Sequence, residues 1–330
     1  MKSFMASILF LLLVSNRNVQ AAARLERLNI DPNQISVSGV SSGAMMAVQL
    51  NVIYSSWIHG MGSIAGGVFA CAENNPMRAV GVCMKMPEQI NVQSTLSRMM
   101  TLAKSGQIDP LENLRNSRIF IYAGQRDTIV NPKASNKLLE MYKNLAHPNF
   151  ISIRSNVPAG HGQPTLNYGN ACEQQSSPWL NNCGYDGAGE ILTKLYGKLK
   201  PRGSSFQTHF RSFDQIEFGA LFASMNTDGF VYVPEVCAAG SIRCRLHIAL
   251  HGCQQSPQFV RDAYLNHAGY NEWAETNAIV VLYPTVGVGF GNPNACWDWW
   301  GYTGADYLTY RGKQVQVIKS MVSRLFGKTK

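Results

Sequence analysis

Short apolar runs, bounded by glycine and polar residues, alternate along the chain with segments whose apolar positions recur at helical spacing. The apolar runs are rich in Val, Ile, Phe and Tyr, which is typical of strands buried on both faces of a sheet. Helical spacing is clear over 133–145, where Ala134, Leu138, Met141 and Leu145 share one face. Strands that alternate with helices predict an α/β fold with a mostly parallel central sheet flanked by helices.

The same patterns predict the order of the elements. The expected strands are 35–38, 61–69, 118–124, 150–153, 208–218, 229–234, 246–250 and 279–284. The first expected helix begins near residue 44, and the others cover 92–103, 133–145, 190–199, 263–276 and 313–326. The strands 208–218 and 229–234 are expected to be antiparallel, and the polar segment 200–205, which contains Pro and Gly, is expected to be a link.

The first apolar run, from Phe4 to Val14, follows Lys2 and leads to the small residues Ala21–Ala23. It is too short to span a bilayer, and small residues at its end suit signal peptidase. Residues 1–21 are therefore predicted to be a signal peptide, and 22–330 a single domain. We expect a secreted protein, periplasmic or extracellular, with no membrane span.

All eight cysteines lie after this leader. An even number of cysteines in an exported protein favours disulfides over metal ligation. Other pairings stay open, but the simplest scheme has three local pairs and one remaining pair: Cys71–Cys83, Cys172–Cys183, Cys237–Cys244 and Cys253–Cys296. None of these pairs has the C-x-x-C spacing of zinc or thioredoxin sites, and we expect neither a metal nor an organic cofactor.

Charge changes this picture little. The formal net charge is +9, but Lys and Arg are scattered and form no basic run, so we expect no nucleic-acid partner. The oligomeric state stays open, with a monomer favoured.

The segment 39–43, Gly-Val-Ser-Ser-Gly, joins an expected strand to an expected helix. This arrangement is typical of the nucleophile elbow of an α/β-hydrolase, a sharp turn that lifts a serine hydroxyl above the sheet. In the usual chain order, several strands and a His-Gly loop precede the elbow, but here only one strand fits before it. The late segment His251-Gly252-Cys253 supplies the missing loop. The sequence therefore predicts a circularly permuted α/β-hydrolase, with the permutation junction near 200–205.

A serine nucleophile needs a base that accepts its proton and a carboxylate that orients the base. Asp127 and His161 follow Ser41 in the chain order typical of this fold, each at the carboxyl end of an expected strand. The alternatives are that Asp127 caps a turn and that His161 is an exposed loop residue. The backbone amides of Ser42 and Cys253 are expected to form the oxyanion hole.

An aromatic run, Cys296-Trp297-Asp298-Trp299-Trp300, follows the next strand on the same rim of the sheet. Tryptophans can line an apolar groove, but they more often anchor a loop or fill a core. Trp297 is predicted to contact substrate, whereas Trp299 and Trp300 are expected to be structural.

Five segments together resemble the single-domain, circularly permuted polyhydroxybutyrate depolymerases of the α/β-hydrolase superfamily, best known from a fungal secreted enzyme. They are Gly39–Met45, Ala123–Asp127, Ala159–Gly162, His251–Gln255 and Cys296–Trp300. The resemblance implies Ser41 as nucleophile, His161 as base and Asp127 as its orienting partner. It also implies Ser42 and Cys253 as oxyanion donors, and Trp297 beside a narrow crevice that admits one polyester strand.

Three functions remain open at this point. The leading one is a secreted serine esterase that hydrolyses poly(3-hydroxybutyrate), or related short-chain polyhydroxyalkanoates and oligomers, through an acyl-enzyme. The second is a feruloyl or acetylxylan esterase, which polar residues around the groove would favour. The third is a catalytically inactive secreted binding protein on the same fold.

Overall fold

The computed structural model describes residues 23–326, so the predicted signal peptide lies outside the described residues. The strands of the main sheet are β1 Ile30–Val40, β2 Ile58–Ile64, β3 Arg118–Tyr122, β4 Ile151–Arg154, β8 Phe210–Asp214, β9 Asp228–Tyr232, β10 Cys244–Leu250 and β11 Ile279–Tyr283. The longer helices are α1 Ser42–Ile53, α3 Val92–Lys104, α4 Lys133–Lys143, α5 Gly187–Tyr196, α8 Ala263–His267, α9 Tyr270–Asn277 and α10 Lys313–Leu325. The short helices are α2 Pro76–Arg78, α6 Glu235–Ala238 and α7 Pro257–Val260.

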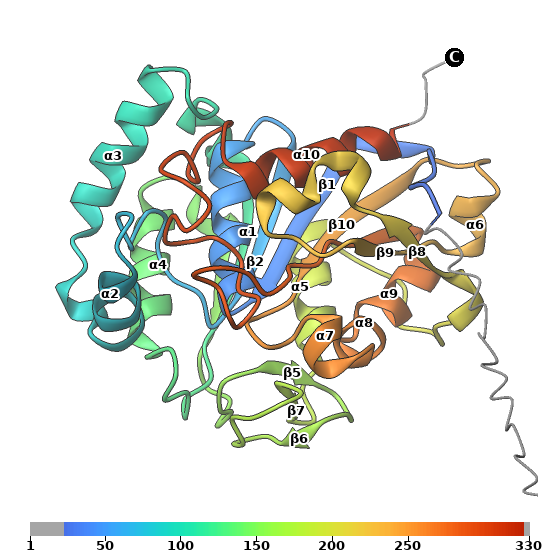
Figure 1. Ribbon diagram of the computed structural model, residues 1–330. Coiled ribbons are helices and arrows are strands. Elements are labelled where there is room, and N and C mark those ends of the chain that lie inside the picture. Colours follow the sequence, from blue (N-terminus) through green and yellow to red (C-terminus); the bar gives the residue numbers. More distant parts are fainter. Residues whose placement is uncertain (1–22, 327–330) are drawn as a thin grey trace, which may run out of the picture.

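One eight-stranded sheet has the strand order β4-β3-β2-β1-β10-β11-β9-β8. Figure 1 shows this sheet crossing the molecule, with β1 and β10 near its middle. The pairs from β4 to β11 are parallel, whereas β11, β9 and β8 pair antiparallel. This confirms the predicted α/β fold with its mostly parallel sheet. The early strand β1 lies in the middle of the sheet, directly beside the late strand β10. The circular permutation and its junction near 200–205 stay predictions.

Two layers of apolar side chains cover the sheet. One core cluster packs the sheet against α1, α3, α4 and α10, and the other packs it against α5, α8 and α9. Both faces of the central parallel strands are therefore buried, which explains why β3 and β11 are apolar along almost their whole length. None of the helices between residues 23 and 326 combines the length and the apolar character needed to cross a bilayer.

A polar group lies buried within the second layer. Ser36 and Ser38 of β1 place their hydroxyls 2.8 Å from the Nδ1 and Nε2 atoms of His247 on β10. The hydroxyls of Tyr196 and Tyr270 complete the cluster, each 2.7 Å from one of the serines. Burial lowers the pKa of His247 to about 3, so the ring is neutral and every polar atom of the cluster has a partner.

A second, three-stranded sheet lies at the carboxyl ends of the main strands. It is formed by β5 Gln163–Thr165, β6 Asn170–Ala171 and β7 Leu180–Asn182. The disulfide Cys172–Cys183 closes this segment, and the other three predicted disulfides, Cys71–Cys83, Cys237–Cys244 and Cys253–Cys296, are also present. Strands this short carry no periodic pattern, so the sequence did not reveal the small sheet.

Two predicted elements are shortened or divided where the backbone takes a positive φ. The predicted strand 61–69 ends at Ile64, because Ala65 has a φ of 53° and forms a bend. The predicted helix 263–276 is divided into α8 and α9 at Gly269, whose φ is 95°. Positive φ values end regular elements, and glycine adopts them at little cost.

The turn between β1 and α1 depends on two glycines. A β-carbon at position 43 would overlap the carbonyl oxygens of Leu250 and His251, and one at position 39 would overlap the backbone of Gly43. Glycine at both positions therefore lets the first turn of α1 lie directly on the end of β1 and on the end of β10.

We expect Gly43→Ala to lower the free energy of unfolding by about 1–3 kcal/mol or more, because rigid backbone atoms cannot yield to the added methyl group. Gly81→Ala is the matched control, since its β-carbon would meet nothing closer than the Met86 Cε atom at 4.0 Å. Urea denaturation of both variants measures the difference. Equal stability of Gly43→Ala and Gly81→Ala would contradict the close packing.

Candidate active site

Ser41 occupies a strained turn between β1 and α1. Its φ is 56° and its ψ is −121°, a combination rare for a residue with a side chain. The strain, of order 1–3 kcal/mol, is held by hydrogen bonds on both sides. The Ser41 amide donates to the Ile64 carbonyl at 2.9 Å, and the Ser41 carbonyl accepts from the Met45 amide at 3.1 Å. These bonds fix the backbone of the predicted nucleophile elbow.

Asp127 and His161 lie together although 34 residues separate them. The His161 Nδ1 atom is 2.7 Å from the Asp127 Oδ2 atom, and both side chains are almost completely buried. The other carboxylate oxygen, Oδ1, accepts the amides of Ile129 and Val130 at 2.9 and 2.8 Å. The carboxylate is therefore fixed on both sides, and it requires the proton of His161 to be on Nδ1. The Nε2 atom is then free to act as a base.

Gln175 joins the loops that carry these two residues. Its Oε1 atom accepts the amides of Thr128 at 2.9 Å and His161 at 3.2 Å, and its Nε2 atom donates to the Thr128 hydroxyl at 3.0 Å. The small disulfide-closed sheet therefore holds the Asp127 and His161 loops in one geometry.

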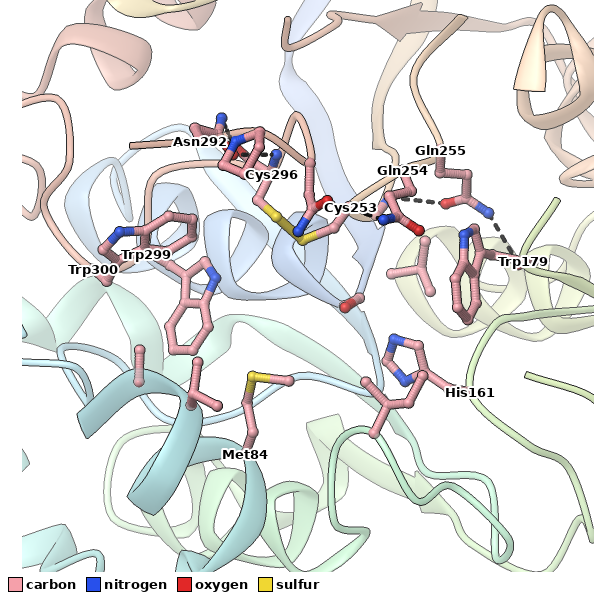
Figure 2. Close-up of a pocket in the computed structure, with 18 of the residues that line it drawn as sticks. Met84, His161, Trp179, Cys253, Gln254, Gln255, Asn292, Cys296, Trp299 and Trp300 are labelled. Carbon is pink, nitrogen blue, oxygen red and sulfur yellow. Dashed lines mark hydrogen bonds between the residues drawn. A yellow bond between two sulfur atoms is a disulfide. The ribbon is translucent and has the colours of Figure 1, made fainter. Parts of the chain in front are cut away.

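A cavity of about 420 Å³ opens at this end of the sheet, and Ser41, His161 and Cys253 all line it. Figure 2 shows His161 and Trp179 on one side, Trp299 and Trp300 on the other, and the Cys253–Cys296 disulfide between them. Half of its other lining residues have apolar side chains, and these are Val40, Pro76, Ala79, Val80, Met84, Ile129 and Pro293. The cavity therefore extends to both sides of the predicted nucleophile.

Two backbone amides adjoin Ser41. Ser42 is the first residue of α1, where the helix itself offers its amide no acceptor. The His251–Cys253 loop packs against the elbow, since a β-carbon at Gly252 would lie 3.3 Å from the Ser41 Cβ atom. Among residues 23–326, the Ser42 and Cys253 amides donate to no other protein group. The structure thus brings all five predicted catalytic and oxyanion residues to one place.

Trp297, predicted to contact substrate, does not line the cavity. Its side chain is 0% exposed and lies beneath the cavity. Its indole Nε1 donates to the His251 carbonyl at 2.9 Å, and its amide donates to the Ser42 hydroxyl at 3.3 Å. Trp297 therefore supports the loop and the elbow, whereas Trp299 and Trp300, which we expected to be structural, line the cavity.

The described residues include no group of three or more His, Cys, Asp or Glu side chains arranged to hold a metal ion.

Comparison with known proteins identifies relatives that cover most of the chain. No protein-family model matches the chain. It is 36% identical over 325 residues to a polyhydroxybutyrate depolymerase of Talaromyces funiculosus, an alignment that covers 92% of this chain and 93% of that protein. The chain belongs to the polyhydroxybutyrate depolymerase family.

A second member of the family, a poly(3-hydroxybutyrate) depolymerase of Delftia acidovorans, is 40% identical over 316 residues. That alignment covers 94% of this chain but 63% of the longer Delftia protein. The crystal structure of a PHB depolymerase from Penicillium funiculosum superposes with a TM-score of 0.86 at 34% identity, covering 92% of this chain and 100% of that one. A serine-to-alanine PHB depolymerase complexed with an R3HB trimer matches with the same values.

Sequence reasoning missed one wall of the cavity in this family member. Ala79, Val80 and Met84 line it from a π-helix, Ala79–Lys85, that the Cys71–Cys83 disulfide closes. A π-helix has no distinctive sequence period, but one of its residues, Cys83, was visible as the predicted disulfide partner of Cys71. Trp179 was missed as well, because it lies in an irregular segment between β6 and β7.

We expect Gln175→Met to lower the free energy of unfolding by about 1–2 kcal/mol, because the Thr128 and His161 amides lose their shared acceptor. Gln174→Met is the matched control, since the Gln174 side chain is exposed and, within the described residues, its hydrogen bond goes to the neighbouring Ser176 hydroxyl. Thermal and urea denaturation compare the two variants. A stability loss no larger than that of Gln174→Met would contradict the bridging role of Gln175.

Proposed function

We propose that this protein is a serine esterase that hydrolyses poly(3-hydroxybutyrate), or related short-chain polyhydroxyalkanoates and their oligomers, through an acyl-enzyme. The observation that carries the proposal is the buried hydrogen bond of 2.7 Å between Asp127 and His161, beside a cavity that His161 shares with a strained Ser41. A nucleophile, a base and an orienting carboxylate on this fold are the groups that ester hydrolysis requires.

The reaction follows from these positions. The Nε2 atom of His161 takes the proton of the Ser41 hydroxyl while the Oγ atom attacks the ester carbonyl carbon. The resulting oxyanion accepts the Ser42 and Cys253 amides. Collapse breaks the ester C–O bond, and His161 gives its proton to the departing alkoxide, which leaves as an alcohol. Water then attacks the acyl-enzyme by the same steps and releases the acid. Asp127 stabilises the imidazolium in both halves.

An apolar polyester segment fits the cavity better than a sugar ester does. Several polar atoms of the glutamine and asparagine side chains on its rim already bond one another or the backbone. The Gln254 Nε2 atom donates to the Asn294 Oδ1 atom at 2.9 Å, and the Gln255 amide group bonds Gly252 and Trp179. The remaining wall is apolar, which suits a methyl-bearing ester chain. The relative solved with an R3HB trimer supports the same substrate class.

The same proposal extends to the organisation of the chain. Residues 1–21 are a signal peptide, and 22–330 form a single catalytic domain whose permutation junction lies near 200–205. Four disulfides support secretion, because such bonds persist in oxidising compartments. At the junction, the Asn277 side chain bonds both the amide and the carbonyl of Lys200, at 2.7 and 3.1 Å. The link therefore lies firmly against α9.

Replacing the nucleophile Ser41, or the carboxylate of Asp127 that orients His161, tests the mechanism. We expect Ser41→Ala to reduce hydrolysis of a hydroxybutyrate trimer to background. Asp127→Asn should lower kcat by about 10⁴-fold, because an amide in place of Oδ2 disfavours the Nδ1–H form of His161. Titration of released acid measures both rates. Retention of most activity in Ser41→Ala would refute the mechanism and favour a different site.

Trp300→Ala tests the substrate class. The loss of an aromatic wall should raise KM for the trimer about tenfold, the equivalent of about 1.4 kcal/mol, with little change in kcat. Phe206→Ala is the control, because Phe206 is 50% exposed and borders a different hollow. A protein that releases ferulate or acetate from sugar esters but leaves the trimer intact would instead favour the carbohydrate esterase. Failure of Ser41 to react with a fluorophosphonate would favour a binding protein.

A further inference from the structure

His251, at the carboxyl end of β10, is a buried histidine that the proposed reaction does not use directly. Its side chain is nearly enclosed, with 2% exposure for the residue. The Val286 amide donates to its Nε2 atom at 3.1 Å, which requires a lone pair on that nitrogen. The proton of the neutral ring is therefore on Nδ1, 2.7 Å from the Gly252 carbonyl oxygen, and Nδ1–H donates to that oxygen.

This hydrogen bond acts on the peptide that contains the Cys253 amide. The Gly252 carbonyl and the Cys253 N–H belong to one trans peptide plane and point in opposite directions. A donor that holds the carbonyl on one side therefore holds the N–H on the other. If this peptide rotated by half a turn, a carbonyl oxygen would replace the N–H and would repel a developing oxyanion.

The neighbouring polar groups of the loop are also fixed. The Gly252 amide donates to the Gln255 Oε1 atom at 2.8 Å, and the His251 carbonyl accepts the Trp297 indole N–H at 2.9 Å. The Cys253–Cys296 disulfide ties the end of the loop to the aromatic segment. Only the Gly252–Cys253 peptide depends on a side-chain donor from His251 for its orientation.

We propose that His251 is a positioning residue, whose Nδ1–H orients the Gly252–Cys253 peptide so that the Cys253 amide faces the oxyanion. The inference rests on the proposed esterase function and deepens it. Burial lowers the pKa of His251 to about 4, so the neutral ring, with its single N–H, is the form present near neutral pH. A neutral ring can donate on one side and accept on the other, as both neighbours require.

Replacing His251 by asparagine or by glutamine tests the two hydrogen bonds of this ring one at a time. In His251→Asn, the Nδ2–H group takes the place of Nδ1–H and can donate to the Gly252 carbonyl, but the Val286 amide loses its acceptor. In His251→Gln, the Oε1 atom takes the place of Nε2 and can accept the Val286 amide, but the Gly252 carbonyl loses its donor. Each variant loses one buried hydrogen bond, so each is a control for the other.

With p-nitrophenyl butyrate as substrate, we expect His251→Gln to lower kcat about 100-fold with KM nearly unchanged, the typical effect of a lost oxyanion donor. His251→Asn should keep kcat within about fivefold of the unaltered enzyme. Affinity for an alkyl boronic acid, which forms a tetrahedral adduct on the nucleophile, should fall in His251→Gln in the same proportion as kcat/KM. Equal losses in both variants, in step with equal shifts in Tm, would overturn the inference and leave the esterase function standing.

A spectroscopic measurement on the unaltered protein keeps the inference testable if either variant misfolds. Long-range ¹H–¹⁵N correlation at neutral pH should show the His251 proton on Nδ1, and a proton on Nε2 would overturn the inference. If the proposed substrate is wrong but the inference about His251 is right, the result differs from those above. In that case the enzyme would not cleave the hydroxybutyrate trimer, while the contrast between His251→Asn and His251→Gln on p-nitrophenyl butyrate would persist.

Discussion

The site depends on a close backbone contact between the early elbow and the late His-Gly loop. Gly43, at the start of α1, lies so near the carbonyls of Leu250 and His251 that no side chain fits between them. The parallel pairing of β1 with β10 sets the direction of this approach. The missing β-carbon of Gly43 allows the close distance between the two backbones. Because of this contact, two amides that are distant in the chain adjoin Ser41.

Around that contact, each functional group is held by a partner that does not itself react. Asp127 is fixed by two amides and His161 by Asp127, while Gln175 joins their loops. On the opposite side, Trp297 links the elbow hydroxyl of Ser42 to the loop. Preorganised donors of this kind stabilise transition-state charge without rearrangement. This accounts for the many buried, hydrogen-bonded polar groups near one apolar cavity.

The residues that carry local signals were predictable from the sequence. Ser41 lies in a strand–turn–helix motif, and Asp127 and His161 follow buried strands, so their positions could be inferred before the fold was known. The cysteines paired by proximity as predicted, because loops of 7 to 12 residues close readily and left one pair over. The chain order also indicated that the His-Gly loop returns to the elbow.

Side-chain direction was not predictable, and Trp297 shows why. Of the three tryptophans within four residues, Trp297 lies in the core, whereas Trp299 and Trp300 line the cavity. The path of their loop decides this, and the Asp298 carboxylate fixes that path by accepting the amides of Gly301, Tyr302 and Thr303. Such non-periodic turns leave no pattern in the sequence. The π-helix wall and the small sheet that carries Gln175 were missed for the same reason.

The most direct test of the central contact is a crystal structure of the enzyme with a phosphonate covalently attached to Ser41. We expect the phosphoryl oxygen to accept hydrogen bonds from both the Ser42 and the Cys253 amides, with the His161 ring on the other side of the phosphorus. A phosphoryl oxygen that points to solvent, or a Cys253 amide turned away from it, would contradict the convergence of elbow and loop.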